Sequence, residues 1–319
     1  MLVNGVSLRY GSQIALEDVS LRIARGSSFA LLGPNGAGKT SLMSILATLR
    51  TADMGKVLVA GHDVNRAAQK VRRSIGVVFQ DSSLDDRLSA EENLDFHGRV
   101  HGMPGKARRA AIDRVLDLVE LSNWREEPVR IFSGGMKRRL EIARALVHDP
   151  EILFLDEPTV GLDAQTRDRI WTYLDGERRR RGLTLLITTH YIEEVDTADC
   201  ICIIDKGRVI AEGSPAELKH AYGKPYLHVV IASPEVREQL LNAYEGAEVI
   251  GNGGVSIPAD GEAFIPEFLA RFGSRVSEIR FEAPTLEAAF LNLTGRTLRE
   301  RFDGEREAQR AAGVRAGQR

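Results

Sequence analysis

Short apolar runs separated by turn residues fill the first 80 positions and predict a series of strands. VNGVSLRY and ALEDVSLRI alternate hydrophobic and polar residues, with Gly11 and Ser12 between them, which is typical of two half-buried strands. FALLG at 29–33, KVLVAG at 56–61 and IGVVFQ at 75–80 are apolar enough for three more strands. Between them, residues from Lys39 to about Leu46 are expected to form a helix that directly follows the buried strand at 29–33.

The middle of the chain has the pattern of helices. Ser89 is followed three positions later by Glu92, which predicts a capping box at a helix start. The next helical segment has an apolar stripe made of Ile112, Val115, Leu116 and Val119. A third helix begins after a Ser-Gly-Gly step, runs from 134 to about 147, and ends before Pro150.

From residue 151 onward, strand and helix patterns alternate. The segments are ILFLDE, a charged helix over about 164–180, LTLLITT, YIEEVDTA, CICIID, and an edge strand at 207–213. Such a βαβ rhythm predicts an α/β fold in which helices cover a sheet with parallel strands. A short helix, SPAELKHAY, completes this first domain, which we expect to span residues 1–222.

A smaller pattern begins after Gly223 and Pro225. Strand, helix, two strands, helix and strand follow in order, which predicts a small α+β sandwich of the ferredoxin-like kind over about 223–296. The segment PTLEAAFLNLTGR adds one more helix. Residues 297–319 contain few large apolar side chains and are expected to form a flexible tail.

Composition and charge narrow the classes of function. The chain has 319 residues, of which 43% are hydrophobic, and a formal net charge of −2, so no overall basic character indicates a nucleic-acid partner. No segment is apolar enough to span a membrane, and the N-terminus lacks the pattern of a signal peptide. Cys200 and Cys202 are interpreted as strand residues. Any work at a membrane is therefore expected from the cytoplasmic face, through a partner.

The strongest chemical motif is GPNGAGKTS, which fits the phosphate loop G-x-x-x-x-G-K-[ST]. It follows a predicted strand and starts a helix, which is the context that this motif requires. Lys39 is expected to reach the β and γ phosphates and the Thr40 hydroxyl to bind Mg²⁺. The loop as a whole comprises Gly33, Pro34, Asn35, Gly36, Ala37, Gly38, Lys39, Thr40 and Ser41.

Two carboxylates end the apolar strand ILFLDE. Beside a phosphate loop, Asp156 is expected on the Mg²⁺ side of the nucleotide. Glu157 lies one residue further out, where it would act as general base toward the attacking water. The alternative for Glu157 is an ordinary surface charge.

A second phosphate-facing helix start lies at Ser133, Gly134 and Gly135. Its free backbone N–H groups and helix dipole favour the binding of an anion. One nucleotide does not easily contact both this helix start and the phosphate loop when both belong to the same domain. Two copies packed head to tail would resolve this, with the Ser-Gly-Gly of one chain closing over the ATP on the phosphate loop of the other.

The phosphate loop, the Ser-Gly-Gly helix, the Leu-Asp-Glu strand, GLD and TTH, in this order and spacing, resemble an ATP-binding-cassette ATPase over about residues 1–222. The remainder, including FEAPTLEAAFLNLTGR, is similar to the C-terminal extension of exporter ATPases of the daunorubicin-resistance type. The resemblance implies ATP and Mg²⁺ as ligands.

The resemblance also implies roles for further residues. Tyr10 matches the aromatic that stacks on adenine, although a strand aromatic packed in the sheet is the alternative. Gln80 matches the glutamine that senses Mg²⁺ and γ-phosphate, and Asp163 matches the aspartate that couples the two sites of a dimer. His190 matches the histidine that contacts the γ-phosphate. The resemblance implies that residues 81–104 receive the membrane partner, and an acidic, solvated helical face is the alternative.

One departure from the family pattern lies in its signature. The usual Leu-Ser-Gly-Gly-Gln is replaced by Phe132, Ser133, Gly134, Gly135 and Met136. Phenylalanine is expected to keep the packing role of leucine. Methionine removes a polar side chain but leaves the backbone N–H groups in place.

The sequence therefore favours the ATP-hydrolysing subunit of an exporter, working as a homodimer or beside a paired cassette subunit. It would drive a separate polytopic permease from the cytoplasmic face of the cell membrane, with a drug or lipid-like cargo implied by the resemblance. A soluble cassette ATPase acting on ribosomes or DNA is a second hypothesis. Its known forms carry two cassettes or long coiled-coil insertions, and neither pattern is present. An importer subunit of the same family is a third.

Overall fold

The computed structural model describes residues 1–79, 82–159, 161–189, 192–231, 233–251, 254–259 and 264–295. The predicted site residues Gln80 and His190 lie outside these ranges, as does the predicted tail. The chain divides into two compact units, Met1–Glu212 and Gly213–Arg319. This division falls earlier in the chain than the boundary expected after residue 222, and it groups the helix SPAELKHAY with the second unit.

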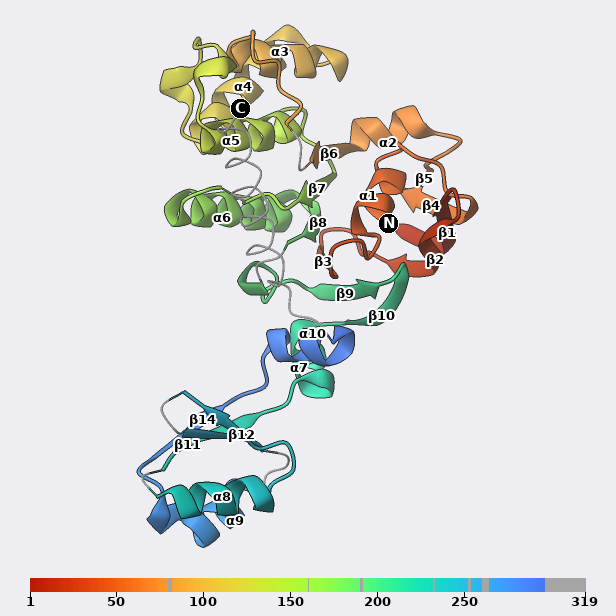
Figure 1. Ribbon diagram of the computed structural model, residues 1–319. Helices are drawn as coiled ribbons and strands as arrows, with labels where there is room; N and C mark the ends of the chain where they lie inside the picture. The colour runs from red at the N-terminus through yellow and green to blue at the C-terminus, as the bar shows by residue number, and fades with distance from the viewer. Residues whose placement is uncertain are drawn as a thin grey trace, which may run out of the picture. The chain divides into compact units, whose positions relative to one another are not determined.

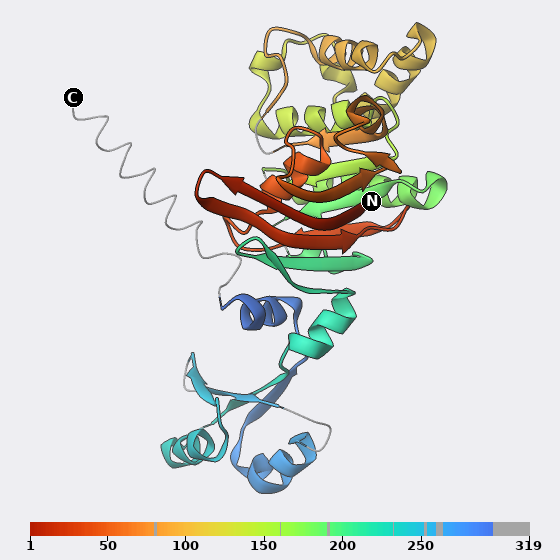
Figure 2. The same cartoon turned by 90° about the vertical axis from the view of Figure 1, so that its right-hand side faces the viewer.

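Two sheets form the first unit (Figures 1 and 2). One is four-stranded, with the order β2-β1-β4-β5 and antiparallel pairing. The other is six-stranded, with the order β10-β9-β3-β8-β7-β6, and its pairs from β9 to β6 are parallel. The strands are β1 (Leu2–Tyr10), β2 (Gln13–Arg22), β3 (Ser28–Leu32), β4 (Met54–Val59), β5 (His62–Asp63), β6 (Ile75–Val78), β7 (Ile152–Asp156), β8 (Thr184–Thr188), β9 (Cys200–Asp205) and β10 (Arg208–Gly213).

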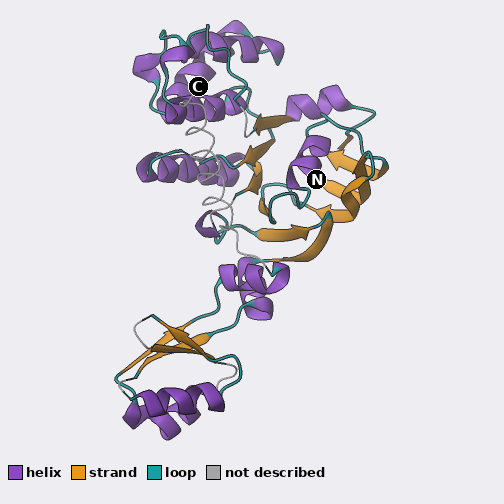
Figure 3. Cartoon of the chain, viewed as in Figure 1, coloured by secondary structure: helices purple, strands orange, loops and turns teal. Residues whose placement is uncertain are grey.

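Helices cover the parallel sheet on both sides (Figure 3). The helices of this unit are α1 (Lys39–Leu46), α2 (Ala68–Ser74), α3 (Ala90–Val100), α4 (Gly105–Leu118), α5 (Gly134–Leu146) and α6 (Ala164–Arg181). The antiparallel sheet and α1 lie on one side of the parallel sheet, and α5 and α6 lie on the other (Figure 1). One apolar core joins both sheets and α1, and it includes Val6, Leu16, Phe29, Ile45 and Phe154. The parallel strands are thus buried on both faces, which explains why they read as continuous apolar runs.

The helical middle region confirms the pattern expected there. Ser89 Oγ accepts from the Glu92 N–H at 3.1 Å, and the Glu92 carboxylate accepts from the Ser89 N–H at 2.7 Å. This is the predicted capping box, and it starts α3. The predicted stripe on α4 is buried throughout, with Ile112, Val115, Leu116 and Val119 each at most 1% exposed.

Some details of the first unit differ from the sequence prediction. The short β5 and α2 were not predicted, since the charged stretch over 62–74 has no clear apolar period. The segment YIEEVDTA forms only a 3₁₀ turn, Ile192–Glu194, among its described residues. Cys200 and Cys202 both lie on β9 as free thiols, as expected, and burial raises the pKa of Cys202 to about 12.

The second unit is built around a separate antiparallel sheet with the order β12-β13-β11-β14. Its elements are α7 (Pro215–Tyr222), β11 (Tyr226–Val230), α8 (Pro234–Ala243), β12 (Glu248–Ile250), β13 (Gly254–Pro258), α9 (Phe264–Phe272), β14 (Glu278–Glu282) and α10 (Leu286–Thr294). Helices α8 and α9 lie on one face of the sheet (Figure 1). Their shared core includes Leu227, Leu240, Ile257, Phe268 and Phe272.

The chain enters and leaves this sheet at neighbouring points. Tyr226 at the start of β11 pairs with Glu282 at the end of β14. The flanking helices α7 and α10 pack against each other, and the Asn292 side-chain amide donates to the Tyr222 carbonyl at 2.8 Å. Helices α7 and α10 therefore pack together next to the point where the chain enters and leaves the sheet of the second unit.

Candidate nucleotide-binding site

The predicted phosphate loop connects the buried strand β3 to α1, as the motif requires. Its glycines are needed for two different reasons. A Cβ on Gly33 would lie 2.2 Å from the Ile204 carbonyl oxygen of β9, so the backbone approaches too closely for a side chain. Gly38 has φ 110°, a left-handed conformation that disfavours other residues. The N-cap residue of α1 is Gly38, which has no side chain to cap the helix, so the loop ends on a helix start that favours anions.

The ammonium of Lys39 is folded back into this loop. Its Nζ donates to the Gly33 carbonyl at 2.7 Å and to the Pro34 carbonyl at 3.2 Å, and the side chain is buried. The pKa of Lys39 is lowered from its ordinary value, and burial is the main cause. The nearby negative charges of Glu157 and Asp156 act in the opposite direction and reduce this shift. The loop therefore surrounds one cation, and the two carboxylates of the Leu-Asp-Glu strand act on that same cation.

Thr40 and Ser41 lie in the first turn of α1, and Tyr10 lies beside them at the end of β1. The Tyr10 and Ser41 hydroxyls are 3.4 Å apart. The Arg50 guanidinium lies 4.5 Å from the centre of the Tyr10 ring. Tyr10 itself is 43% exposed. Tyr10 is thus a surface aromatic next to the phosphate loop.

Sheet topology explains how the carboxylates reach the loop. Strand β8 lies between β3 and β7, and all three run parallel, so their carboxyl ends share one edge. Asp156 is buried and accepts a hydrogen bond from the Thr188 hydroxyl of β8. Glu157 has the left-handed φ of 49°, and its N–H donates to the Thr188 carbonyl at 3.0 Å. Thr188 therefore holds both acidic residues in place.

Arg138 of α5 is an important residue of this site that the sequence analysis missed. It is buried, and it forms an ion pair with the buried carboxylate of Glu141 at 3.1 Å. Its guanidinium also donates to four backbone carbonyls, those of Phe79, Asp156, Glu157 and Pro158. One side chain thus connects the helix that follows Ser-Gly-Gly to the carboxylate turn and to the end of β6. Its position on the same helix face as buried Ile142 and Ala145 was the available signal.

The Ser-Gly-Gly turn (residues 133–135) lies at the start of α5, on the other side of the parallel sheet from α1 (Figure 1). Ser133 caps the helix by accepting from the Met136 N–H at 3.2 Å. Ser133 and Gly134 are exposed. Phe132, which replaces the usual leucine, is buried and packs edge-on against Trp124.

The GLD segment lies next to this turn in the same chain. A Cβ on Gly135 would come within 3.1 Å of the Gly161 carbonyl oxygen. Asp163 is exposed and caps α6 by accepting from the Thr166 N–H at 2.9 Å and the Thr166 hydroxyl at 2.7 Å. The hydrogen bonds from Thr166 lower the pKa of Asp163. The Ser-Gly-Gly turn and the GLD segment therefore adjoin on the first unit.

The comparisons with known proteins agree with this architecture. Residues 16–160 match the family model described as ABC transporter. The chain is 40% identical over 303 residues to the daunorubicin resistance ATP-binding protein DrrA3 of Streptomyces coeruleorubidus, covering 92% of this chain and 95% of that protein. It is 37% identical over 301 residues to the Nod factor export ATP-binding protein I of a Rhizobium species (strain N33), covering 92% and 96% of the two chains.

Solved structures show the same likeness. A dimeric ATP-binding cassette in a post-hydrolysis state, bound to ADP and Pi, superposes with a TM-score of 0.63 at 29% identity, covering 67% of this chain and 97% of that chain. Together with the phosphate loop and its carboxylates, these relationships show that the chain belongs to the ATP-binding-cassette transporter family and is the ATP-hydrolysing, ATP-binding subunit of an exporter.

Proposed function

We propose that two copies of this chain pack head to tail and enclose two ATP molecules, each between a phosphate loop and the partner's Ser-Gly-Gly turn. The supporting observation is that Ser133 and Gly134 are exposed at a helix start, across the parallel sheet from α1. The adjoining GLD segment would then lie in the same interface, with Asp163 coupling the two sites. ATP would stabilise the closed dimer and its hydrolysis would weaken it.

Within each site, Lys39 would exchange its contacts with loop carbonyls for contacts with the β and γ phosphates. Backbone N–H groups among residues 35–41 would bind the remaining phosphate oxygens, and Tyr10 would stack on the adenine. Glu157 would accept a proton from the water that attacks the γ-phosphorus, releasing ADP and phosphate. For Gln80 and His190 we propose the roles at the γ-phosphate that the resemblance implies.

The oxygen donors of the site fit Mg²⁺. The carboxylate of Asp156 is buried at the sheet edge, and Thr40 presents a hydroxyl in the first turn of α1. Hard oxygen ligands of this kind are those that Mg²⁺ prefers. Thr40, Asp156 and Gln80 would hold the ion, which would neutralise phosphate charge during hydrolysis.

The rest of the proposal concerns the assembly. The chain would act at the cytoplasmic face of the cell membrane on a separate permease; among the described residues, no helix is long and apolar enough to cross a bilayer. The names of the relatives support a hydrophobic cargo such as a drug or a lipid-like compound. For the second unit we propose the ferredoxin-like arrangement, supported by its strand order and by α8 and α9 on one face.

Purification from native membranes tests the assembly. The tagged Glu157→Gln chain, solubilised gently with ATP, should retain a polytopic membrane protein in near-equal amount. The double variant Glu157→Gln, Lys39→Ala, purified in the same way, is the control. It shows how much membrane protein is retained when ATP does not close the dimer. Recovery of ribosomal or DNA-repair proteins without a membrane protein would contradict the proposed permease partner.

The substitution Lys39→Ala should weaken ATP binding itself by at least about tenfold, because it removes the charge-assisted contacts to phosphate. Equilibrium binding of a fluorescent ATP analogue measures the effect. The exposed Lys106 of α4 provides the matched control, since Lys106→Ala removes the same charge far from the loop sequence. Unchanged affinity in Lys39→Ala would refute the assignment of the phosphate loop.

A further inference from the structure

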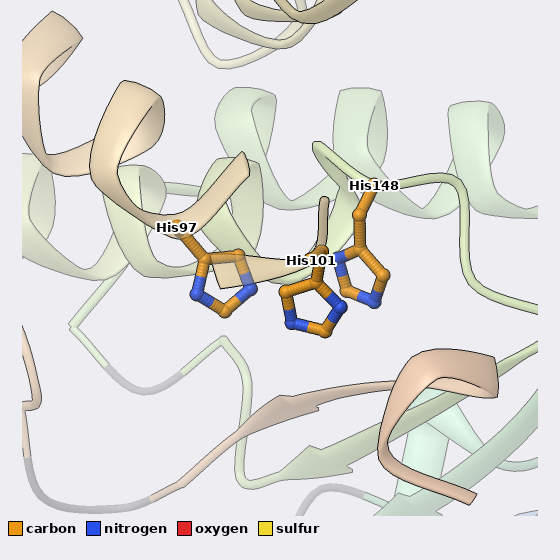
Figure 4. A group of neighbouring side chains, drawn as sticks. All are labelled: His97, His101 and His148. Carbon is orange, nitrogen blue, oxygen red and sulfur yellow. The ribbon is translucent and has the colours of Figure 1, made fainter. Parts of the chain in front are cut away.

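Three histidines that are far apart in the sequence meet beside the helical region of the first unit (Figure 4). His97 lies on α3, His101 follows the end of that helix, and His148 follows α5. One ring nitrogen from each lies within 4.8 Å of the others. The centres of the His101 and His148 rings are 3.7 Å apart, and those of His97 and His101 are 4.6 Å apart.

A backbone carbonyl sets the orientation of one of these rings. His148 Nε2 lies 3.0 Å from the Ile75 carbonyl of β6, and a carbonyl can only accept, so Nε2 carries the proton. The neutral ring then has its lone pair on Nδ1. That atom is buried and has no hydrogen-bond partner in the described part of the chain. An imidazole held by a carbonyl on one nitrogen and unsatisfied on the other is the arrangement found around protein-bound metals.

The surroundings of the three side chains also favour the neutral form of the imidazole. Burial is the main cause that lowers the pKa of His97 to about 3 and that of His148 to about 4, and it lowers the pKa of His101 as well. Neutral imidazole is the ligating form of histidine.

His97 and His101 line a cavity of about 450 Å³ that gives access to the cluster. Its wall also carries Arg73 and Arg144, which approach His101 and His97 and oppose a cation. Near His148, Arg181 adds positive charge and Asp149 negative charge. These charges favour a fourth ligand that is an anion or a hydrogen-bond acceptor. The Arg144 Nε is buried and has no hydrogen-bond partner among the described residues, so it is a donor available to such a ligand.

We propose that His97, His101 and His148 form a binding site for a divalent transition-metal ion, with zinc as the best match. Imidazole nitrogens suit zinc, copper and nickel, and three histidines leave one position of a tetrahedral site open for water or an anion. Metal–nitrogen bonds of about 2.0–2.1 Å place the ligand atoms about 3.3 Å apart. To bind one ion, the stacked rings of His101 and His148 would turn out of their parallel arrangement so that their ligand nitrogens face a common point. The ion would tie α3 to the connection between α5 and β7.

The test uses the full chain without a histidine tag, free of nucleotide, titrated with Co²⁺ and then with Zn²⁺. We expect one Co²⁺ per chain with the visible absorption of a tetrahedral, nitrogen-ligated site, which Zn²⁺ displaces. The metal should also raise the thermal melting temperature. The substitution His101→Phe keeps a flat ring to stack on His148 but removes the ligand atom, and it should weaken binding at least about tenfold.

Two further variants make the result unambiguous. The exposed His220 of the second unit is the control, and His220→Ala should leave the titration unchanged. His97→Phe removes a second ligand without touching the His148 contact to Ile75, and should repeat the loss seen with His101→Phe. Absence of a tetrahedral Co²⁺ spectrum, or equal affinity in wild type, His97→Phe and His101→Phe, would overturn the proposal.

Discussion

Replacing Glu157 with glutamine should reduce ATP hydrolysis by about 10²–10⁴-fold, the usual contribution of a general base, while ATP still binds. Glutamine has the same size as glutamate but does not accept a proton from water. The backbone of Glu157, with its N–H on Thr188 and its carbonyl on Arg138, keeps its contacts because neither involves the altered group. Phosphate release and equilibrium ATP binding, measured on the same preparation, separate the two effects.

The same variant should accumulate as an ATP-bound dimer, which light scattering measures directly. Glu151, exposed at the start of the same strand segment, is the matched control, and Glu151→Gln should hydrolyse ATP at the normal rate. Normal turnover in Glu157→Gln would remove this residue from the role of base. A monomer in saturating ATP would instead contradict the head-to-tail dimer.

Replacing Arg138 with alanine should lower the free energy of unfolding by about 3–5 kcal/mol, the usual result of breaking a buried ion pair. The substitution leaves the buried Glu141 carboxylate without its counter-ion. It also removes the donor shared by the carbonyls of Asp156 and Glu157. The carboxylate turn would lose its support, so ATPase activity should fall as well. Urea unfolding followed by circular dichroism gives the stability change.

An exposed arginine on a neighbouring helix provides the comparison. Arg109→Ala on α4 should change the unfolding free energy by no more than about 0.5 kcal/mol. The variant Arg138→Lys should fall between the two, because lysine restores the charge but not the planar set of donors. A loss below about 1 kcal/mol in Arg138→Ala would show that the carbonyls are satisfied in another way.

Local pattern was enough to predict the strand–loop–helix at the phosphate site. The apolar run at 29–33, the glycine spacing and the start of α1 at Lys39 are all encoded within a dozen or so residues, and they appear in the structure where expected. The capping box at Ser89 was equally local. Such features are predictable because neighbouring residues determine backbone conformation, burial and helix starts.

Features that depend on long-range contacts were not predictable in this way. The carbonyl partners of Arg138 lie up to 59 residues away in the sequence, and a helical pattern shows only that the position is buried. The histidine cluster likewise joins α3 to a residue after α5, and the packing of the Ser-Gly-Gly turn against Gly161 depends on where β7 and α6 lie. Each of these requires the sheet order, which no single segment encodes.

The pairing of Tyr226 with Glu282 gives the second unit the geometry of an insertion. Paired residues of neighbouring strands have Cα atoms about 5 Å apart, so the chain enters and leaves the sandwich at nearly one point. Helices α7 and α10 already contact each other beyond that point. During evolution the sandwich could therefore be gained, exchanged or lost as one segment, since a short connection would rejoin the two helices without disturbing another core.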